Sequence, residues 1–242
     1  MDRSKPIYEV NDSSDGEPEE YFRDSRIEYE SAEETFRDAA DNYSIPYWSY
    51  QPEYIEVWCE KDALSGVLQP ITSKWKIPLV ICRGYQSIGN IHDRLDIYRS
   101  MKHLELVDGT VTVVNERKVT ILYFGDYDPR GQNIPDVIQR DFKSLGYELN
   151  LVKVALTEQQ ITLSNLIPAP CKKRDTMANH WIGQHGDMVY ELDALEPATL
   201  LQIVEGSIKA HFNLDKFKER NEYIKTGRQE LARLTSKYFE EA

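Results

Sequence analysis

The sequence predicts an α/β fold in which a parallel, twisted sheet of about four strands carries helices on both faces and is followed by a C-terminal helical extension. Between residues 54 and 156, short segments of β-rich or apolar composition alternate with segments whose apolar residues recur at helical spacing. Strands that are separated by crossover helices pair in parallel, and the helices then cover both faces of the sheet. With 242 residues, the chain is long enough to bury a sizeable core.

Each of the first two predicted strands is followed by a helical pattern. Residues 54–59 (YIEVWC) are β-rich, and residues 61–72 (KDALSGVLQPIT) then place four apolar residues at helical spacing. Residues 77–82 (IPLVIC) form the second strand. Residues 87–106 (SIGNIHDRLDIYRSMKHLEL) predict a helix with its apolar residues on one side.

The third and fourth predicted strands enclose a further helix. Residues 118–124 (KVTILYF) form the third strand and residues 147–156 (YELNLVKVAL) the fourth. Between them, residues 134–146 predict a helix with Pro135 in its first turn and Gly146 as its stop.

The remainder of the chain is less regular. Residues 214–239 predict a charged helix that is interrupted at Gly227. The sequence therefore predicts three parts: an acidic, partly disordered arm (1–50), an α/β domain (51–205) and a C-terminal helical extension (206–242).

The net charge of −12 is concentrated in the arm. Residues 1–41 hold 14 acidic and 5 basic residues, which leaves a net charge of only −3 for the rest of the chain. The arm is polar and poor in branched apolar residues, so we expect residues 1–19 to be disordered and residues 20–40 to form one surface helix. The overall charge therefore does not exclude a nucleic-acid partner, which would be bound by Lys and Arg of the domain.

Other features of the composition narrow the class of protein. No apolar run reaches the roughly 18 residues that a membrane span needs, and the N-terminal residues lack a signal-peptide core, so we expect a cytoplasmic protein without membrane contact. The three cysteines lie far apart in the sequence and form no CxxC pair. Their placement argues against a disulfide framework and against a structural zinc site.

Two of the predicted strands end in carboxylates. Glu60 follows the first strand, and Asp126 and Asp128 follow the third. Residues i and i+2 of an extended chain lie roughly 7 Å apart on one face, so both aspartates can look into one pocket. Because ligands bind at the carboxyl ends of parallel strands, Glu60 is expected to face them. Three hard oxygen donors suit Mg²⁺, with Mn²⁺ as an alternative, and phosphate oxygens would complete the coordination.

Three other kinds of motif contain a similar aspartate pair. A calcium loop beginning at Asp126 would need a ligand at its fifth position, where Arg130 stands, and Glu at its twelfth, where Val137 stands. A phosphatase of the haloacid-dehalogenase type normally carries the pair on its first strand, whereas two predicted strands precede this one. A capped strand-to-helix turn without chemistry fits the pair alone, but the second acidic strand end at Glu60 favours a functional site.

In combination, EVWCEKDAL (56–64) and GDYDPRG (125–131) resemble the Toprim domain, the metal-binding module of topoisomerases, primases, recombination proteins and several nucleases. Within that group they are most similar to the A subunit of topoisomerase VI, its meiotic relatives and the nuclease subunit of the Wadjet plasmid-defence system. Weaker likeness extends to CRGYQS (82–87) and VYELDAL (189–195). The resemblance covers about residues 50–200 and makes the predicted α/β domain Toprim-like.

The resemblance implies a role for each matching position. Glu60 would act in acid–base catalysis or hold metal, and Asp126 and Asp128 would bind the metal. Glu56 shares strand parity with Glu60 and is a reserve candidate, or a residue of the sheet edge. The further candidates are the phosphate contacts Lys61, Arg83 and Arg130 and the ligands of a second metal, Glu191 and Asp193.

One feature of the enzymes that the chain resembles is missing. The topoisomerase and meiotic enzymes attack DNA with a tyrosine on a winged-helix domain before the Toprim part, whereas the tyrosines before residue 54 here lie in an acidic context. We therefore expect hydrolysis of DNA by a metal-activated water instead of strand passage. A non-catalytic module that binds nucleic acid or a protein, and a nuclease for RNA, stay as alternatives. A winged-helix or other protein partner, and a homodimer, are compatible with this reading.

Overall fold

The computed structural model describes six stretches of the chain, residues 29–82, 88–101, 103–107, 110–114, 117–171 and 177–240. They divide into two compact units. The larger unit is Ile45–Tyr223, and the smaller unit combines residues 29–44 with residues 224–240. The predicted disorder at residues 1–19 and the candidate Arg83 lie outside the described residues.

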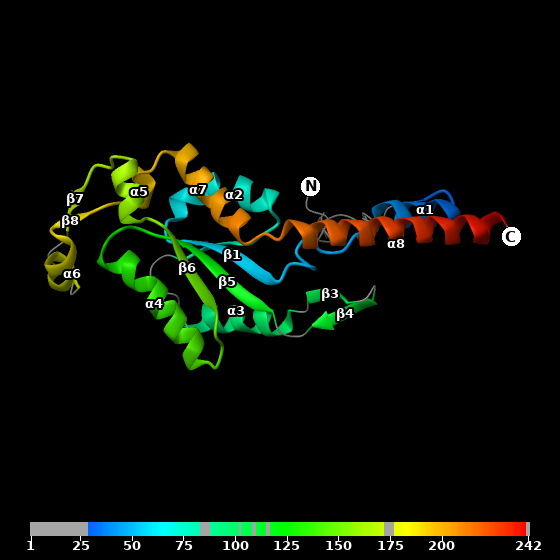
Figure 1. Ribbon diagram of the computed structural model, residues 1–242, viewed down its shortest axis with the longest axis horizontal. Coiled ribbons are helices and arrows are strands. Elements are labelled where there is room, and N and C mark those ends of the chain that lie inside the picture. The colour runs from blue at the N-terminus through cyan, green and yellow to red at the C-terminus, as the bar shows by residue number, and fades with distance from the viewer. Residues whose placement is uncertain are drawn as a thin grey trace, which may run out of the picture. The chain divides into compact units, whose positions relative to one another are not determined.

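The larger unit is built on a four-stranded sheet in the order β2-β1-β5-β6 (Figure 1). Its strands are β1 (Glu53–Cys59), β2 (Leu79–Ile81), β5 (Lys118–Phe124) and β6 (Asn150–Ala155). All three pairings between neighbouring strands are parallel. The predicted α/β fold with a parallel sheet of about four strands is therefore confirmed.

Helices cover both faces of this sheet. On one face lie α2 (Ser65–Lys74), which follows the short 3-10 helix η1 (Asp62–Leu64), and α7 (Pro197–Ala210). On the other face lie α3 (Ile88–Ser100) and α4 (Pro129–Ser144). Figure 1 shows the two pairs of helices on opposite sides of the strands. The larger unit thus has three layers, as the crossover pattern of the sequence predicts.

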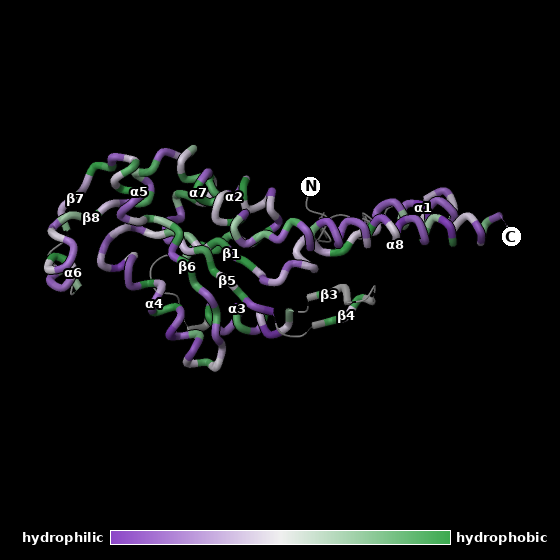
Figure 2. The backbone as a smooth tube through the Cα atoms, viewed as in Figure 1, coloured by the Kyte–Doolittle hydropathy of each residue, from purple (hydrophilic) through white to green (hydrophobic). Residues whose placement is uncertain are grey.

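Alternate residues of the two central strands enter separate hydrophobic clusters. Val57 of β1 and Leu122 of β5 are fully buried on the face that α2 and α7 cover. Their neighbours Trp58 and Tyr123 are buried on the opposite face, with α3 and α4. Since side chains alternate along a strand, burial on two faces explains why adjacent residues of both strands are buried. Figure 2 shows hydrophobic segments in β1 and in β5.

One segment that the sequence predicts as helix is part of a hairpin. α3 ends at Ser100, and the next residues form β3 (His103–Val107), which pairs antiparallel with β4 (Thr110–Val114). The predicted helix over residues 87–106 was therefore too long. The Leu104 amide donates a 2.9 Å hydrogen bond to the Ser49 carbonyl, and this tertiary contact leaves no trace in the local apolar pattern.

Between β6 and α7, the elements in the described residues are short. They are α5 (Glu158–Leu163), β7 (Ala169–Pro170), α6 (Ala178–His185), β8 (Met188–Val189) and η2 (Leu192–Ala194). β7 pairs antiparallel with β8, and Tyr127 and Tyr190 exchange backbone hydrogen bonds of 2.8 and 3.0 Å. These contacts bring the chain back to the carboxyl end of β5.

In the smaller unit, α1 (Ala32–Asn42) packs on the C-terminal part of α8 (Leu214–Glu240). The predicted interruption at Gly227 is wrong, because α8 continues through this residue. A Cβ there would lie 2.5 Å from Cε1 of Tyr43, so glycine allows the Tyr43 ring to approach the helix closely. Although α8 is long, no helix in the described part of the chain is also apolar enough to cross a membrane.

Glu56, the reserve candidate for the site, forms a buried network instead of lying at a sheet edge. Its side chain is fully buried, and β1 has a paired strand on each side. It accepts hydrogen bonds from Trp58 Nε1 and Tyr98 Oη, both at 2.8 Å, and pairs with Arg94 at 3.0 Å. The network joins the central strand to α3.

Glu56→Ala is expected to lower the free energy of unfolding by about 3–5 kcal/mol, because Arg94 and two buried donors lose their acceptor. Urea denaturation followed by circular dichroism measures the change. Glu148, whose side chain is 86% exposed, provides the matched control, and Glu148→Ala should alter stability by less than about 0.5 kcal/mol. Equally small effects of both substitutions would show that the network does not stabilise the fold.

Candidate functional site

The candidate residues meet where the two central strands end. Cys59 at the end of β1 is paired with Phe124 at the end of β5. The chain leaves β1 through α2 on one face and leaves β5 through α4 on the other, and these connections diverge to β2 and β6. Such a switch in topology opens a crevice at the carboxyl ends of the strands. Glu60 and Asp126 follow these ends within two residues.

Glu60 extends from the end of β1 toward the residues that follow β5. Its Oε2 accepts long hydrogen bonds from the Asp126 amide at 3.3 Å and from the Tyr123 hydroxyl at 3.4 Å. Burial raises the pKa of the Glu60 carboxyl, and the charges of Asp126 and Asp128 raise it further. The ionised form of Glu60 therefore lacks sufficient compensating positive charge.

Asp126 joins the end of β5 to η2. Its Oδ1 accepts a 2.7 Å hydrogen bond from the backbone amide of Leu192, a residue 66 positions away. Burial raises the pKa of Asp126 even though this hydrogen bond and the Lys61 ammonium act to lower it. Among the described residues nothing forms a hydrogen bond with Oδ2, so one carboxylate oxygen is left for a ligand.

Asp128 caps the helix that follows. Its Oδ1 accepts a 2.7 Å hydrogen bond from the Gly131 amide, and Pro129 occupies the first helical position. α4 therefore begins earlier than predicted, and Pro135 lies inside the helix, not in its first turn. The first turn of α4 is polar, so the spacing of apolar residues did not indicate that the helix begins there. The capped turn is thus present, and it engages only one oxygen of the carboxylate.

Lys61 lies among three carboxylates. Its Nζ is 2.7 Å from Asp193 Oδ1, 3.1 Å from Glu191 Oε2 and 3.4 Å from Asp126 Oδ1. Partial burial acts to lower the pKa of Lys61, but the hydrogen bonds to Asp193 and Glu191 and the charge of Asp126 outweigh it and raise the pKa. The two acidic residues that the sequence offered as ligands of a second metal therefore surround an ammonium group.

The described residues contain no group of three or more His, Cys, Asp or Glu side chains arranged to hold a metal ion. Mg²⁺, however, commonly binds through one or two carboxylates and completes its octahedron with water and phosphate oxygens. Glu60, Asp126 and Asp128 offer donors of this kind, and burial, together with the neighbouring carboxylates, raises the pKa of Glu60 and of Asp126. In the chemistry of its donors, the set fits Mg²⁺.

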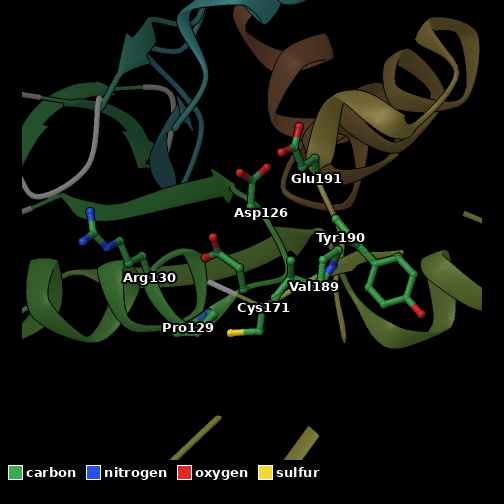
Figure 3. A pocket seen from close by; sticks show the side chains of 10 residues that line it. Asp126, Pro129, Arg130, Cys171, Val189, Tyr190 and Glu191 are labelled. Carbon is green, nitrogen blue, oxygen red and sulfur yellow. The ribbon is translucent and has the colours of Figure 1, made fainter. Parts of the chain in front are cut away.

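A cavity of about 350 Å³ opens beside Asp126 and Asp128 (Figure 3). Asp126, Asp128 and Glu191 line it, together with Arg130 and with apolar residues that include the two of β7. Its wall is therefore partly acidic and partly apolar. Arg130 lies in the first turn of α4, whereas Arg83 is outside the described residues.

Lys153 is a residue of this region that sequence reasoning missed. It lies on β6 beside Tyr123, and its Nζ is buried without a hydrogen-bond partner among the described residues, 5.8 Å from the centroid of the Tyr127 ring. Burial lowers its pKa to about 8, although the charges of Asp128 and Glu60 act to raise it. A lone lysine within the apolar segment LVKVAL was the signal that could have found it.

Comparisons of the sequence with known proteins do not assign a family. No protein-family model matches the chain, and no curated protein matches it at a significant level. The candidate site is therefore defined by its own geometry: two adjacent strand ends, three carboxylates and two lysines.

Gly131 is required where α4 passes the end of β5, because a Cβ there would lie 2.3 Å from the Asp126 carbonyl oxygen. Gly131→Ala is expected to destabilise the protein by about 1–3 kcal/mol. Gly66 in α2 has open space at the same atom, so Gly66→Ala should be neutral or stabilise by up to about 1 kcal/mol. Thermal unfolding compares the two variants, and equal stabilities would contradict the close approach.

The buried ammonium of Lys153 is expected to make stability depend on pH. Its folded pKa of about 8 lies below the ordinary value of 10.5, so the unfolded chain binds this proton more tightly. The contribution of Lys153 to the free energy of unfolding therefore increases as the pH rises from about 8 to 10.5. Below about pH 8, the buried ammonium group lowers the stability of the protein. Lys153→Met should stabilise the protein at neutral pH by on the order of 2 kcal/mol and abolish the rise.

Urea denaturation in EDTA, at neutral pH and near pH 10, measures both effects of the Lys153 substitution. The wild-type protein measured in the same buffers is the reference, since other groups also titrate in this range. An unchanged difference in stability between the two pH values would show that the Lys153 pKa is not lowered.

Proposed function

We propose that the chain is a Toprim-like, Mg²⁺-dependent nuclease that hydrolyses phosphodiester bonds in DNA. One observation carries the proposal. Glu60 and Asp126, which follow adjacent strand ends, and Asp128 gather negative charge in a partly buried position, and a cavity opens beside the two aspartates. Burial raises the pKa of Glu60 and of Asp126, and the neighbouring carboxylates raise it further. A divalent cation would balance the charge, and the phosphate oxygens of a nucleic acid would complete its coordination.

Each residue of the site would have its own role in hydrolysis. When bound, Mg²⁺ supplies activation of water and stabilisation of the leaving oxygen. Glu60, whose pKa is raised by burial, is suited to accept a proton from the attacking water. Arg130 on the cavity wall would contact a phosphate oxygen. Asp126 and Asp128 keep a fixed orientation, because one oxygen of each accepts a backbone hydrogen bond.

A non-catalytic module is the second candidate function. Two observations favour it. Asp126 and Asp128 each accept a hydrogen bond from a backbone amide, as structural residues do. The described residues also hold no preassembled group of three metal-binding side chains. In this case the domain would bind nucleic acid, or a winged-helix or other protein partner, without turnover.

Nicking of supercoiled plasmid DNA by the purified protein, with Mg²⁺ or Mn²⁺ against EDTA, tests the proposal. Glu60→Gln and Asp126→Asn should each slow nicking by at least about 100-fold, the first because an acid–base group is lost and the second because a metal ligand is lost. The matched control is Glu148→Gln, which changes an exposed carboxylate outside the site and should leave the rate unaltered.

Loss of activity can be separated from loss of folding. Because burial and neighbouring charge disfavour the ionised form of Glu60, Glu60→Gln should be at least as stable as the wild type in metal-free buffer at neutral pH. If both site variants still nick DNA at the wild-type rate, the chemistry does not occur here. Metal binding without turnover by the wild type favours the binding module, and parallel digestion of RNA distinguishes the two nucleic acids.

A further inference from the structure

Lys61 bears on how many metal ions the site holds. We propose that its ammonium group is a resident cation that fills the position among Asp126, Glu191 and Asp193. The site then takes one divalent ion, and Glu191 and Asp193 orient the lysine without binding a second ion. The count of one ion rests on the proposed function, whereas the assignment of Lys61 depends on contacts of its own.

The carboxylates reach the ammonium group from separate parts of the chain. Lys61 stands two residues beyond the end of β1, Asp126 two residues beyond β5, and Glu191 and Asp193 at the start of η2. Each supplies an oxygen within 3.4 Å of Nζ. An ammonium group has three N–H donors. Two hydrogen bonds go to Glu191 and Asp193, and Asp126 adds an ion pair at 3.4 Å. Figure 3 shows the Asp126 and Glu191 carboxylates at the same end of the cavity.

Lys61 is more buried than two of the carboxylates around it, as expected of a cation at their centre. Its side chain is 18% exposed, whereas those of Glu191 and Asp193 are 62% and 40% exposed. The distances from Nζ, 2.7 to 3.4 Å, suit hydrogen bonds and ion pairs. Mg²⁺ would need oxygens at about 2.0–2.1 Å from the same point, so an ion and the ammonium group cannot share it.

Asp126 connects this position to the proposed metal site. Its Oδ1 faces Lys61 and the Leu192 amide, and Oδ2 has no hydrogen-bond partner in the described part of the chain. The two oxygens would therefore serve two cations, the ammonium group on one side and a divalent ion on the other. A second divalent ion would require Lys61 to leave three carboxylates.

Titration of the full-length protein with Mn²⁺, followed by the electron paramagnetic resonance signal of the free ion, measures the number of bound ions. We expect one ion per chain in the wild type and two in Lys61→Met, because three carboxylates have lost their cation. The double variant Lys61→Met/Asp193→Asn should return to one. Lys74, which pairs with Glu205 at 2.8 Å outside the site, provides the matched control, and Lys74→Met should keep the wild-type count.

Two ions in the wild type, or no additional ion in Lys61→Met, would overturn the inference. If Lys61→Met does not fold without metal, the exposed variant Glu191→Gln/Asp193→Asn decides. Retention of the wild-type count supports the inference, and loss of an ion overturns it.

Failure of the proposed function would look different. A wild type that binds no ion, together with a Lys61→Met variant that binds one, supports the role of Lys61 and refutes the metal site at Glu60, Asp126 and Asp128. One bound ion without nicking of DNA refutes only the nuclease.

Discussion

The parallel pairing of β1 with β5 is the constraint on which the rest of the molecule depends. Both strands are buried on two faces, so helices must cover both, and the connections through α2 and α4 diverge from the shared strand ends. The backbone hydrogen bonding between the two strands continues one residue beyond β1, where the Glu60 amide donates to the Phe124 carbonyl at 2.9 Å. A slip of one residue in this register would turn the side chain of Glu60 to the other face of the sheet. The fold and the position of the acidic crevice are therefore set by the same pairing.

Charge at this edge of the sheet is balanced only in part. Lys61 compensates one side of Asp126, and Lys153 adds a positive charge that is buried without a hydrogen-bond partner among the described residues. Glu60 nevertheless keeps a raised pKa because of its burial and its acidic neighbours. A buried ammonium group without a partner and carboxylates close to one another both reduce the stability of a folded protein. Such a loss of stability is typical of a site that binds a ligand.

The features that could be predicted from the sequence are those carried by local pattern. Segments of β-rich or apolar composition predicted the sheet, and their boundaries predicted that Glu60 would lie near Asp126. Three features depend on contacts between distant residues and could not be predicted. The hairpin after α3 is attached by the hydrogen bond from Leu104 to Ser49. The cluster of carboxylates around Lys61 forms because β7 and β8 return η2 to the strand end. Lys153 stands out in the sequence as a lone lysine in an apolar segment, but the burial of its amine without a hydrogen-bond partner among the described residues depends on the surroundings of β6.

The hydrogen bond from the Leu192 amide to Asp126 links the crevice to a turn 66 residues away. A ligand that binds Asp126 in its present orientation would favour the position of η2 that supplies the Leu192 amide, and a molecule that fixes η2 in this position would hold the carboxylate ready for such a ligand. Such coupling is reciprocal, so the two events change each other's affinity by the same factor. The partly exposed turn at Glu191 and Asp193 is consequently a place where a bound molecule would alter the affinity of Asp126 for a ligand.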